Sequence, residues 1–517
     1  MVWTSGYEPV EVGGTTLPAM VLDAAATAGE RPALVDGASG ARVSYATLAE
    51  RIESVAAGLR ARGFGEGDVL ALWAPNLPQW AGVALGAMAA GGTVTGIPPQ
   101  ATERELNTHL RDSGASVLVT LPSLAQAARS AAEMSAVRDL IALGPAPGAV
   151  AIEELLARGR TAPVASEAQC ALLPYSSGTT GLPKGVVLSH RNLVTAARQI
   201  NRALRISSRD TVLAVVPFCH VMGFVIKLAV PLSAGATVVT VPRFDLDRFL
   251  ELIEQHRVTV MVVPPAIATA LARQPRAGRH ELSSLELVVS GGAPLSAEVQ
   301  AELAARLPHA AVGQGWGMTE TSAGATAPDR ERGSVPGSVG RVMADTELRV
   351  IDPVSGADLG AGERGELLVR GPQVMEGYLN RPADTAEILG PDGWLRTGDL
   401  GEVDTGGNVF VVERLKELIK VNAHQVAPAE LEGLISTHPA VHDVAVIARP
   451  DERRGEMPVA VVVTRGELDA GELVDWVAER VSPFKRLGAV RFAASIPRTP
   501  SGKVLRRLLA EEERTPV

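Results

Sequence analysis

The chain has few cysteines and no excess of positive charge. Its two cysteines among 517 residues, Cys170 and Cys219, are too few for a disulfide framework or a thiolate metal site. We expect them to be small buried side chains in a reducing compartment. A net charge of −9 argues against general nucleic-acid binding, so affinity for phosphate must come from local basic groups. With 46% hydrophobic and 21% charged residues, the composition excludes disordered and fibrous proteins.

The sequence also lacks an uninterrupted membrane segment and a targeting signal. Residues 69–102 contain no charge, but prolines and glycines divide them into strand-sized and helix-sized pieces, which predicts a buried α/β core. The N-terminal MVWTSGYEPVEV has neither a basic region nor an apolar run, and the C-terminal Thr-Pro-Val is not a peroxisomal tripeptide. We therefore expect a cytoplasmic protein without stable membrane insertion.

The most informative segment is YSSGTTGLPKGV, at positions 175–186. Its glycines let backbone amides approach anionic oxygens, its hydroxyls add donors, and its lysine adds positive charge. A loop that binds the phosphates of ATP is predicted from Ser176, Ser177, Gly178, Thr179, Thr180 and Lys184. A common P-loop would need glycine and then a hydroxyl where the chain has Pro183 and Gly185, so a P-loop NTPase is disfavoured. A plain glycine-rich turn between two strands is the alternative.

Four further motifs follow along the chain. They are QGWGMTET at 314–321, GWLRTGDLG at 393–401, VERLKELIKVNAHQVAPAELE at 412–432 and PRTPSGKVLRR at 497–507. With the glycine-rich loop, they make the chain resemble the adenylate-forming superfamily of acyl-CoA synthetases, peptide-synthetase adenylation domains and luciferases. The resemblance is strongest to the 4-coumarate/acyl-CoA ligase branch, and it covers nearly the whole length in family order.

The predicted elements indicate an α/β fold with more than one domain, because 517 residues exceed what one core usually organises. The first third alternates as a parallel sheet requires, with helices at 45–62, 77–90 and 103–113 and strands at 69–73, 93–97 and 116–120. Thr102 and Glu105 predict a capping box for the third helix, and Gly114 ends it. A second α/β half is predicted from strands at 211–216, 237–241, 258–263 and 287–290 and a helix at 245–256.

The remaining residues predict a β-rich subdomain and a compact C-terminal domain. Short glycine-rich strands occupy about 335–400. An α+β pattern then follows, with helices at 428–436, 470–480 and 503–513 and strands at 441–448, 458–464 and 490–492. We predict a large N-terminal domain at 1–413, comprising two doubly wound α/β subdomains and the β-rich one. A small mobile α+β domain at 414–517 completes the chain, with Lys416 as the hinge.

The resemblance implies an ATP site assembled from several motifs. Its adenine side would be a loop of Gly292, Ala293 and Pro294, for which a simple turn is the alternative. The nucleotide would also be lined by Gln314, Gly315, Trp316, Gly317, Met318 and Thr319. Trp316 stands where a tyrosine is common, which keeps a stacking face but removes a hydroxyl. Asp399 would accept hydrogen bonds from the ribose hydroxyls, with support from Arg414; the alternatives are a turn aspartate and a surface ion pair.

Charge must be neutralised at the reacting centre, because an anionic carboxylate meets an anionic α-phosphate. By resemblance, Lys503 is the catalytic lysine that bridges the two groups; the alternative is a solvated lysine at a helix start, as is expected for Arg506 and Arg507. Glu320 is expected to hold Mg²⁺ together with phosphate oxygens and water, with a helix N-cap as the alternative. His220 resembles the family histidine between the acyl pocket and the adenylate, although a lone histidine on an apolar segment is often a core residue.

The acyl and CoA sites are also implied by the resemblance. The residues expected at the acyl group are His220, Val221, Met222, Gly292 and Gly315. Hydroxycinnamate ligases often have a tyrosine at the position of Met222, which cannot donate to a phenol oxygen, so the pocket should prefer apolar faces. The residues expected at CoA are Arg243, Lys420, Asn422 and Ala423, with Lys420 serving the thioester step. Ala423 adds a methyl group where many relatives have glycine.

These expectations describe an ATP- and Mg²⁺-dependent carboxylate:CoA ligase. It would convert a cinnamate-like aryl or medium-chain acid into acyl-AMP and pyrophosphate, and then transfer the acyl group to CoA. One alternative passes the acyl-AMP to a carrier protein or to oxygen, as luciferase-like relatives do. Another is a nucleotide-sensing protein without catalysis. The expected partners are the acid, ATP and CoA, without nucleic acid, in a monomer or homodimer.

Overall fold

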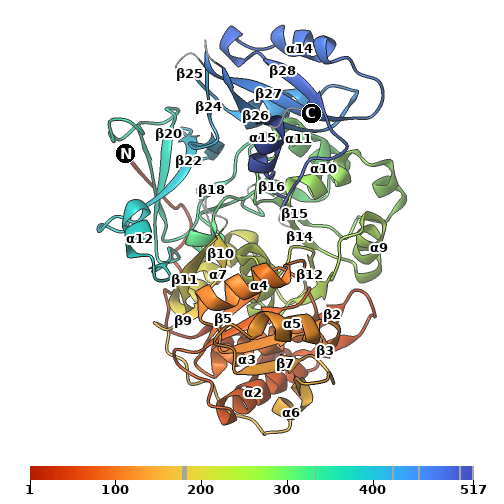
Figure 1. The fold of residues 1–517 in the computed structure, drawn as a ribbon, viewed down its shortest axis with the longest axis vertical. Coiled ribbons are helices and arrows are strands. Elements are labelled where there is room, and N and C mark those ends of the chain that lie inside the picture. The colour runs from red at the N-terminus through yellow and green to blue at the C-terminus, as the bar shows by residue number, and fades with distance from the viewer. Residues whose placement is uncertain (177–182, 332, 422–423, 452–453, 500–501, 515–517) are drawn as a thin grey trace.

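The computed structural model describes residues 1–176, 183–331, 333–421, 424–451, 454–499 and 502–514. Figure 1 shows two α/β sheets in the lower and central parts, a β-rich sheet at the left and a separate lobe at the top. We call residues up to Arg414 the large lobe and the residues after them the C-terminal lobe. The predicted fold class, α/β with a smaller α+β part at the end, is confirmed. The functional boundary between 413 and 414 stays a prediction.

The first sheet confirms the predicted alternation. Its strands, in spatial order, are β10 (Tyr175–Ser176), β11 (Lys184–Ser189), β9 (Cys170–Leu172), β5 (Thr93–Ile97), β4 (Val69–Trp73), β6 (Val117–Thr120), β7 (Asp139–Ala142) and β8 (Val150–Ala151). Its helices include α2 (Tyr45–Ala61), α3 (Pro78–Ala89) and α4 (Glu103–Ser113). The capping box of Thr102 and Glu105 is present, and Gly114 ends α4 in the left-handed conformation.

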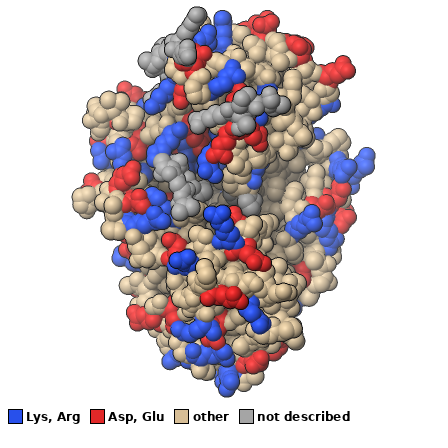
Figure 2. Space-filling model, in the orientation of Figure 1, with Lys and Arg blue, Asp and Glu red and all other residues tan. Residues whose placement is uncertain are grey.

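The charge-free segment at 69–102 forms β4, α3 and β5 and is almost wholly buried, as predicted. In the part of the chain that the structure describes, no helix has both the length and the apolarity needed to cross a bilayer. Over the face drawn in Figure 2, acidic and basic side chains are interspersed.

The second sheet takes two strands from the start of the chain. Its order is β16 (Ala311–Gln314), β15 (Leu287–Ser290), β14 (Val260–Val263), β12 (Thr211–Ala214), β13 (Thr237–Thr240), β2 (Pro32–Asp36) and β3 (Arg42–Ser44). The predicted strands at 211–290 are confirmed, and α9 (Leu246–His256) matches the predicted helix. The pairing of β13 with β2, which sets Val238 beside Leu34, joins residues about two hundred positions apart. A periodic pattern within one segment holds no information on such a partner.

The remaining sheets are mainly antiparallel. The β-rich sheet has the order β1 (Val2–Thr4), β19 (Glu347–Ile351), β20 (Gly365–Arg370), β22 (Leu395–Val403) and β23 (Val409–Arg414). The C-terminal lobe has β25 (His424–Val426), β24 (Ile419–Val421), β27 (Gly455–Thr464), β26 (Val441–Asp451) and β28 (Ala489–Phe492), with α13 (Pro428–Ser436), α14 (Ala470–Ala478) and α15 (Arg506–Arg514). This lobe buries a hydrophobic cluster of its own, as an independently folding unit requires.

The prediction of a helix from residue 503 was wrong at its start, because α15 begins at Arg506. Gly502 has a φ of 88°, and its amide donates a hydrogen bond to the carbonyl of Thr499. The amide of Thr499 in turn donates to the carbonyl of Lys503. Lys503 therefore stands in a hydrogen-bonded loop before the helix, which leaves its side chain free to reach toward the large lobe.

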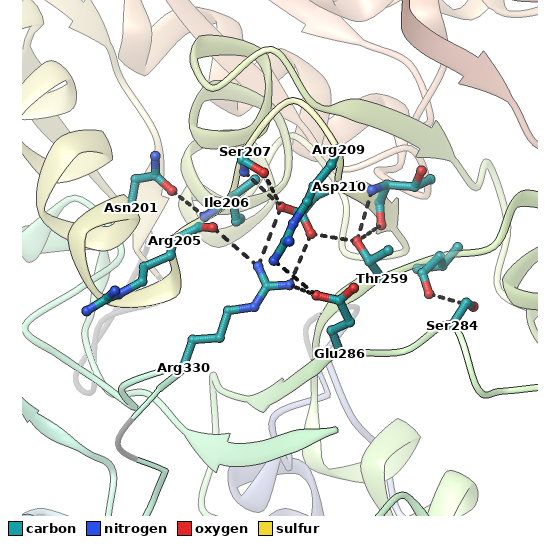
Figure 3. A network of polar contacts seen from close by, with 12 residues as sticks. Asn201, Arg205, Ile206, Ser207, Arg209, Asp210, Thr259, Ser284, Glu286 and Arg330 are labelled. Atoms are coloured by element: carbon teal, nitrogen blue, oxygen red, sulfur yellow. Dashed lines mark hydrogen bonds and ion pairs between the residues drawn. The ribbon is translucent and has the colours of Figure 1, made fainter. Parts of the chain in front are cut away.

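A network of polar contacts holds the amino ends of β12, β14 and β15 together (Figure 3). Arg330 donates to Asp210 Oδ1 at 3.1 Å and also contacts Glu286 and the carbonyl oxygen of Arg205. Asp210 is fully buried and accepts further hydrogen bonds from Ser207 and Thr259. A buried carboxylate needs such partners, because its desolvation is unfavourable.

Lys227 is a fully buried lysine in a π-helix at Met222–Ala229. Its ammonium nitrogen donates to the carbonyl oxygen of Leu213 at 3.2 Å. Burial lowers the pKa of Lys227 to about 7. The folded protein therefore gives up this proton near neutrality, whereas an unfolded chain keeps it to a much higher pH.

Replacement of Lys227 by methionine should stabilise the protein at pH 7 by about 1–4 kcal/mol, because an isolated buried charge is replaced by an apolar chain of similar length. Because the folded pKa lies below the unfolded one, the free energy of unfolding of the unaltered protein should rise with pH from about 7 toward 10. The Lys227→Met protein should lack this rise. Urea unfolding at several pH values between 7 and 10 measures this rise, with the exposed Lys416→Met as the control. If the free energy of unfolding changed with pH in the same way for Lys227→Met and for the unaltered protein, the lowered pKa of Lys227 would be refuted.

Candidate active site

A cavity lies where the C-terminal lobe meets the large lobe. Figure 2 shows this face hollowed between the two lobes. The apolar lining includes Ile200, Leu204, Val221, Met222, Ile226, Val262, Val289 and Met343. The polar and glycine lining includes Tyr175, Ser176, His220, Ser290, Gly291, Gly292, Gly315, Trp316, Gly317, Thr319, Glu320, Arg414 and Lys503. Most of the predicted site residues that fall within the described part of the chain are thus brought together from segments far apart in the sequence.

The carboxyl ends of parallel strands build the floor of the cavity. β15 ends at Ser290 and leads into Gly291 and Gly292, while β16 ends at Gln314 and leads into the segment from Gly315 to Glu320. Ligands bind at this edge of open α/β sheets, because the loops there leave crevices between them. Gly292 has a φ of 86°, in the left-handed region, so a larger side chain would be strained at this turn.

Glu320 is buried and oriented by a tyrosine that the sequence analysis missed. The hydroxyl of Tyr378, in β21 (Gly377–Tyr378), donates to Glu320 Oε1 at 2.7 Å. Lys184 Nζ lies 5.0 Å from the centre of the Tyr378 ring and 3.1 Å from Asp384 Oδ1. Tyrosine is rare in this chain, with four in all, so the tyrosine in the short glycine-rich segment around 377–378 was the signal that could have pointed to it.

Asp399 is paired with its predicted neighbour Arg414 and also with Trp316. Its Oδ1 lies 3.1 Å from Arg414 Nε, and its Oδ2 accepts a hydrogen bond of 2.8 Å from the indole nitrogen of Trp316. Burial raises the pKa of Asp399, against the opposing effects of Arg414 and the indole. The expectation that Trp316 only loses a hydroxyl is therefore incomplete, since its N–H supplies a donor of its own to the carboxylate.

Lys503 reaches the cavity from the C-terminal lobe. Its side chain is 30% exposed, and its Nζ lies 3.6 Å from Glu417 Oε1. Burial and the nearby Arg414 lower the pKa of Lys503, whereas Glu417 and Asp399 act in the opposite direction.

The prediction that Arg506 is solvated was wrong, because it forms ion pairs with Glu417 and Glu432. Arg507 is 84% exposed, as predicted.

His220 lines the cavity next to Val221 and Met222. Its Nε2 is buried and makes no hydrogen bond with any described residue, and burial lowers the pKa of the ring. The imidazole is therefore neutral at pH 7, with one nitrogen available to a ligand. The same wall continues with Val221 and with Met222 and Ile226 of the π-helix.

Other predicted site residues lie outside the cavity lining. Gln314 is buried and bonds the backbone of Leu295 through both its amide oxygen and its amide nitrogen, so its side chain fixes the neighbouring loop and does not face the cavity. Ala293 and Pro294 belong to that loop but do not line the cavity, and the same holds for Lys184. Arg243 and Lys420 are exposed, and Lys416 occupies an exposed turn between β23 and β24. The predicted Ser177, Gly178, Thr179, Thr180, Asn422 and Ala423 lie outside the described residues.

Comparison with known proteins identifies the family. Residues 21–379 match the model of the AMP-binding enzymes, and residues 430–503 match that of the AMP-binding enzyme C-terminal domain. The chain is 38% identical to 4-coumarate–CoA ligase 3 of Oryza sativa subsp. japonica, over 98% of this chain and 94% of that protein.

The solved structures agree with the sequence comparison. ATP-bound MatB from Rhodopseudomonas palustris matches with a TM-score of 0.88 at 30% identity, over 97% of this chain and 99% of that one. Apo MatB from the same organism matches with a TM-score of 0.78 at 30% identity, over 96% of this chain and 99% of that one. The chain therefore belongs to the AMP-binding enzymes of the adenylate-forming superfamily, in the branch of the 4-coumarate–CoA ligases.

Proposed function

We propose that the protein is an ATP- and Mg²⁺-dependent carboxylate:CoA ligase that passes through an acyl-AMP intermediate. The observation that carries the proposal is the cavity itself, which takes Glu320 and Arg414 from the large lobe and Lys503 from the C-terminal lobe, with Asp399 bound to Arg414 behind the lining. An apolar chamber adjoins this charged end, as an acid with an apolar tail requires. The higher TM-score to ATP-bound than to apo MatB supports a lobe arrangement suited to the adenylation step.

In the first step, a carboxylate oxygen of the acid attacks the α-phosphorus of ATP and pyrophosphate leaves. Both reactants are anionic, so catalysis consists mainly of positioning and charge neutralisation. Lys503 would supply positive charge between the carboxylate and the α-phosphate. Asp399 would accept hydrogen bonds from the ribose hydroxyls, while Arg414 and Trp316 hold its carboxylate in place.

The residues around Glu320 fit a magnesium ion. Tyr378 holds one carboxylate oxygen, which leaves the other to face the phosphates. Mg²⁺ is commonly held by one or two carboxylates together with substrate phosphates and water. When bound, the ion would neutralise charge on the phosphate oxygens. Among the described residues no cluster of three or more metal-ligating side chains occurs, so the phosphates must complete the site.

In the second step, the thiol of CoA attacks the acyl carbonyl carbon and AMP leaves. Lys420 is exposed and does not line the cavity in this arrangement, so a rotation of the C-terminal lobe about Lys416 would be needed to bring it to the thioester site. Within the described ranges, few polar contacts join the lobes: examples are Arg273 to the carbonyl of Ser436 and the amide of Ala429 to Glu413. An interface of this kind is compatible with relative motion of the lobes.

The apolar wall of Val221, Met222 and Ile226 supports an aryl acid of the cinnamate type, or a medium-chain acid, as the substrate. We also propose a cytoplasmic location. A panel of cinnamic, benzoic and fatty acids, scored for pyrophosphate and for acyl-CoA, tests the proposal. Pyrophosphate without thioester would favour an acyl-AMP ligase with another acceptor. Absence of acid-dependent pyrophosphate across the panel would favour a nucleotide sensor.

A further inference from the structure

Glu417 lies beside Lys503 and belongs to no site assigned so far. It occupies the turn between β23 and β24, and its backbone amide donates to the carbonyl of Arg414 at 2.9 Å. Its carboxylate is 20% exposed, with Oε1 at 3.6 Å from Lys503 Nζ and Oε2 at 2.6 Å from Arg506 Nη1. One oxygen thus faces the cavity lysine, while the other is held by an arginine.

Arg506 fixes the orientation of this carboxylate. Its second nitrogen, Nη2, lies 2.8 and 2.9 Å from the two oxygens of Glu432, and its Nε donates to the carbonyl of Val446 at 3.2 Å. A guanidinium bound at three sites is rigid and directional. The result is a chain of alternating charge that runs from Glu432 through Arg506 and Glu417 to Lys503.

A lysine at this position needs such a partner before ATP arrives. Its four-carbon side chain has many rotamers, and ordering it reduces its conformational entropy. The cations Arg414 and Arg506 lie nearby and disfavour its charged form, whereas Glu417 and Asp399 favour it. Because an ammonium carries three N–H donors, a single contact with Glu417 leaves the others available for the carboxylate and the α-phosphate.

We propose that Glu417 is a positioning residue for adenylation, which holds the ammonium of Lys503 charged and aimed at the cavity before the nucleotide binds. This inference rests on the proposed function, since it assumes that Lys503 serves the first half-reaction. Glu417 itself is not part of the cavity lining, so it would act through Lys503.

The test measures both half-reactions in full-length variants. Glu417→Gln keeps the shape but removes the charge, and it should slow acid-dependent acyl-AMP formation about tenfold because the ammonium is no longer held in place. Conversion of a supplied acyl-AMP to acyl-CoA should change less than about twofold. In a Lys503→Ala background, Glu417→Gln should have no further effect on adenylation, because the group that it positions is absent.

Glu432→Gln is the matched control, because Glu432 shares Arg506 but does not contact Lys503. Arg506 keeps its contacts with Glu417 and with the carbonyl of Val446 in this variant, so adenylation should stay within about twofold. Equal slowing by the two glutamine variants, equal loss of both half-reactions, or an undiminished Glu417→Gln effect without Lys503 would overturn the proposal and point to lobe stability alone.

Glu417→Asp provides a second variant should Glu417→Gln not fold. Its side chain keeps the negative charge but is one methylene shorter, so the carboxylate lies farther from Lys503. Adenylation should again be slowed more than thioester formation, but less strongly than in Glu417→Gln. If Lys503→Ala itself retains full adenylation, the proposed role of Lys503 fails. If Lys503→Ala is inactive while Glu417→Gln is normal, only the present inference fails.

Discussion

Replacement of Lys503 by alanine is expected to slow acyl-AMP formation by roughly 100- to 1,000-fold, the size of effect seen when one preorganised charge-stabilising group is removed. The reason lies in the cavity, where Lys503 is the cation that the C-terminal lobe contributes among the described residues. Rapid-quench measurement of acyl-AMP or pyrophosphate gives the rate. Conversion of chemically prepared acyl-AMP to acyl-CoA should survive, because the lysine leaves the site in that step.

Lys420→Ala is the reciprocal variant. Lys420 is exposed in β24 and lies outside the cavity, so its loss should affect thioester formation more than adenylation. Lys503→Ala should thus mainly slow adenylation, whereas Lys420→Ala should mainly slow thioester formation. If both substitutions slowed both steps equally, the division of labour between the two lysines would be wrong.

Replacement of Arg330 by methionine is expected to destabilise the protein by about 3–5 kcal/mol, since it leaves a buried carboxylate without its cation. Asp210 is fully buried and Arg330 is 9% exposed, so water cannot replace the lost partner. Arg330 also contacts Glu286, next to β15, and the carbonyl of Arg205 at the end of the helix α7 (His190–Leu204), so both of these links are lost at the same time. Urea unfolding followed by tryptophan fluorescence measures the change.

Arg209→Met is the matched control for this effect. Arg209 lies 3.5 Å from the same Glu286, but its side chain is 72% exposed. Exposed ion pairs contribute little, so we expect a change within about 0.5 kcal/mol. Combining Arg330→Met with Asp210→Asn should recover part of the loss. Equal effects of Arg330→Met and Arg209→Met would show that burial does not govern this network.

Local patterns predicted most of the elements because the relevant physics is local. The capping box at Thr102 and the apolar runs of β12 to β15 depend on neighbouring residues alone. The start of α15 was misplaced because the hydrogen bonds that Thr499 forms with Gly502 and Lys503 compete with helix formation. The pairing of β2 with β13 depends on residues distant in sequence, which no segment pattern specifies.

The sequence motifs predicted the residues that they contain, but not the partners that orient those residues. Lys503, Glu320, Asp399 and Trp316 line the cavity or contact its lining, as the motifs implied. Their partners were not predicted, because only the folded structure brings them close. The Tyr378 hydroxyl lies 2.7 Å from Glu320 Oε1, and Glu417 Oε1 lies 3.6 Å from Lys503 Nζ. Gln314 is a motif residue that does not line the cavity; its side chain instead hydrogen-bonds the backbone of Leu295 in the loop beside the site.

The fate of a carboxylate oxygen tests the central claim, that groups of both lobes join an organic acid to the α-phosphate of ATP. The protein would be given a substrate acid labelled with ¹⁸O in its carboxylate, together with ATP, Mg²⁺ and CoA, and the nucleotide product would be weighed by mass spectrometry. Attack of the acid on the α-phosphorus predicts AMP that carries one heavy oxygen, with unlabelled pyrophosphate. Formation of ADP, or of AMP without label, would contradict this account.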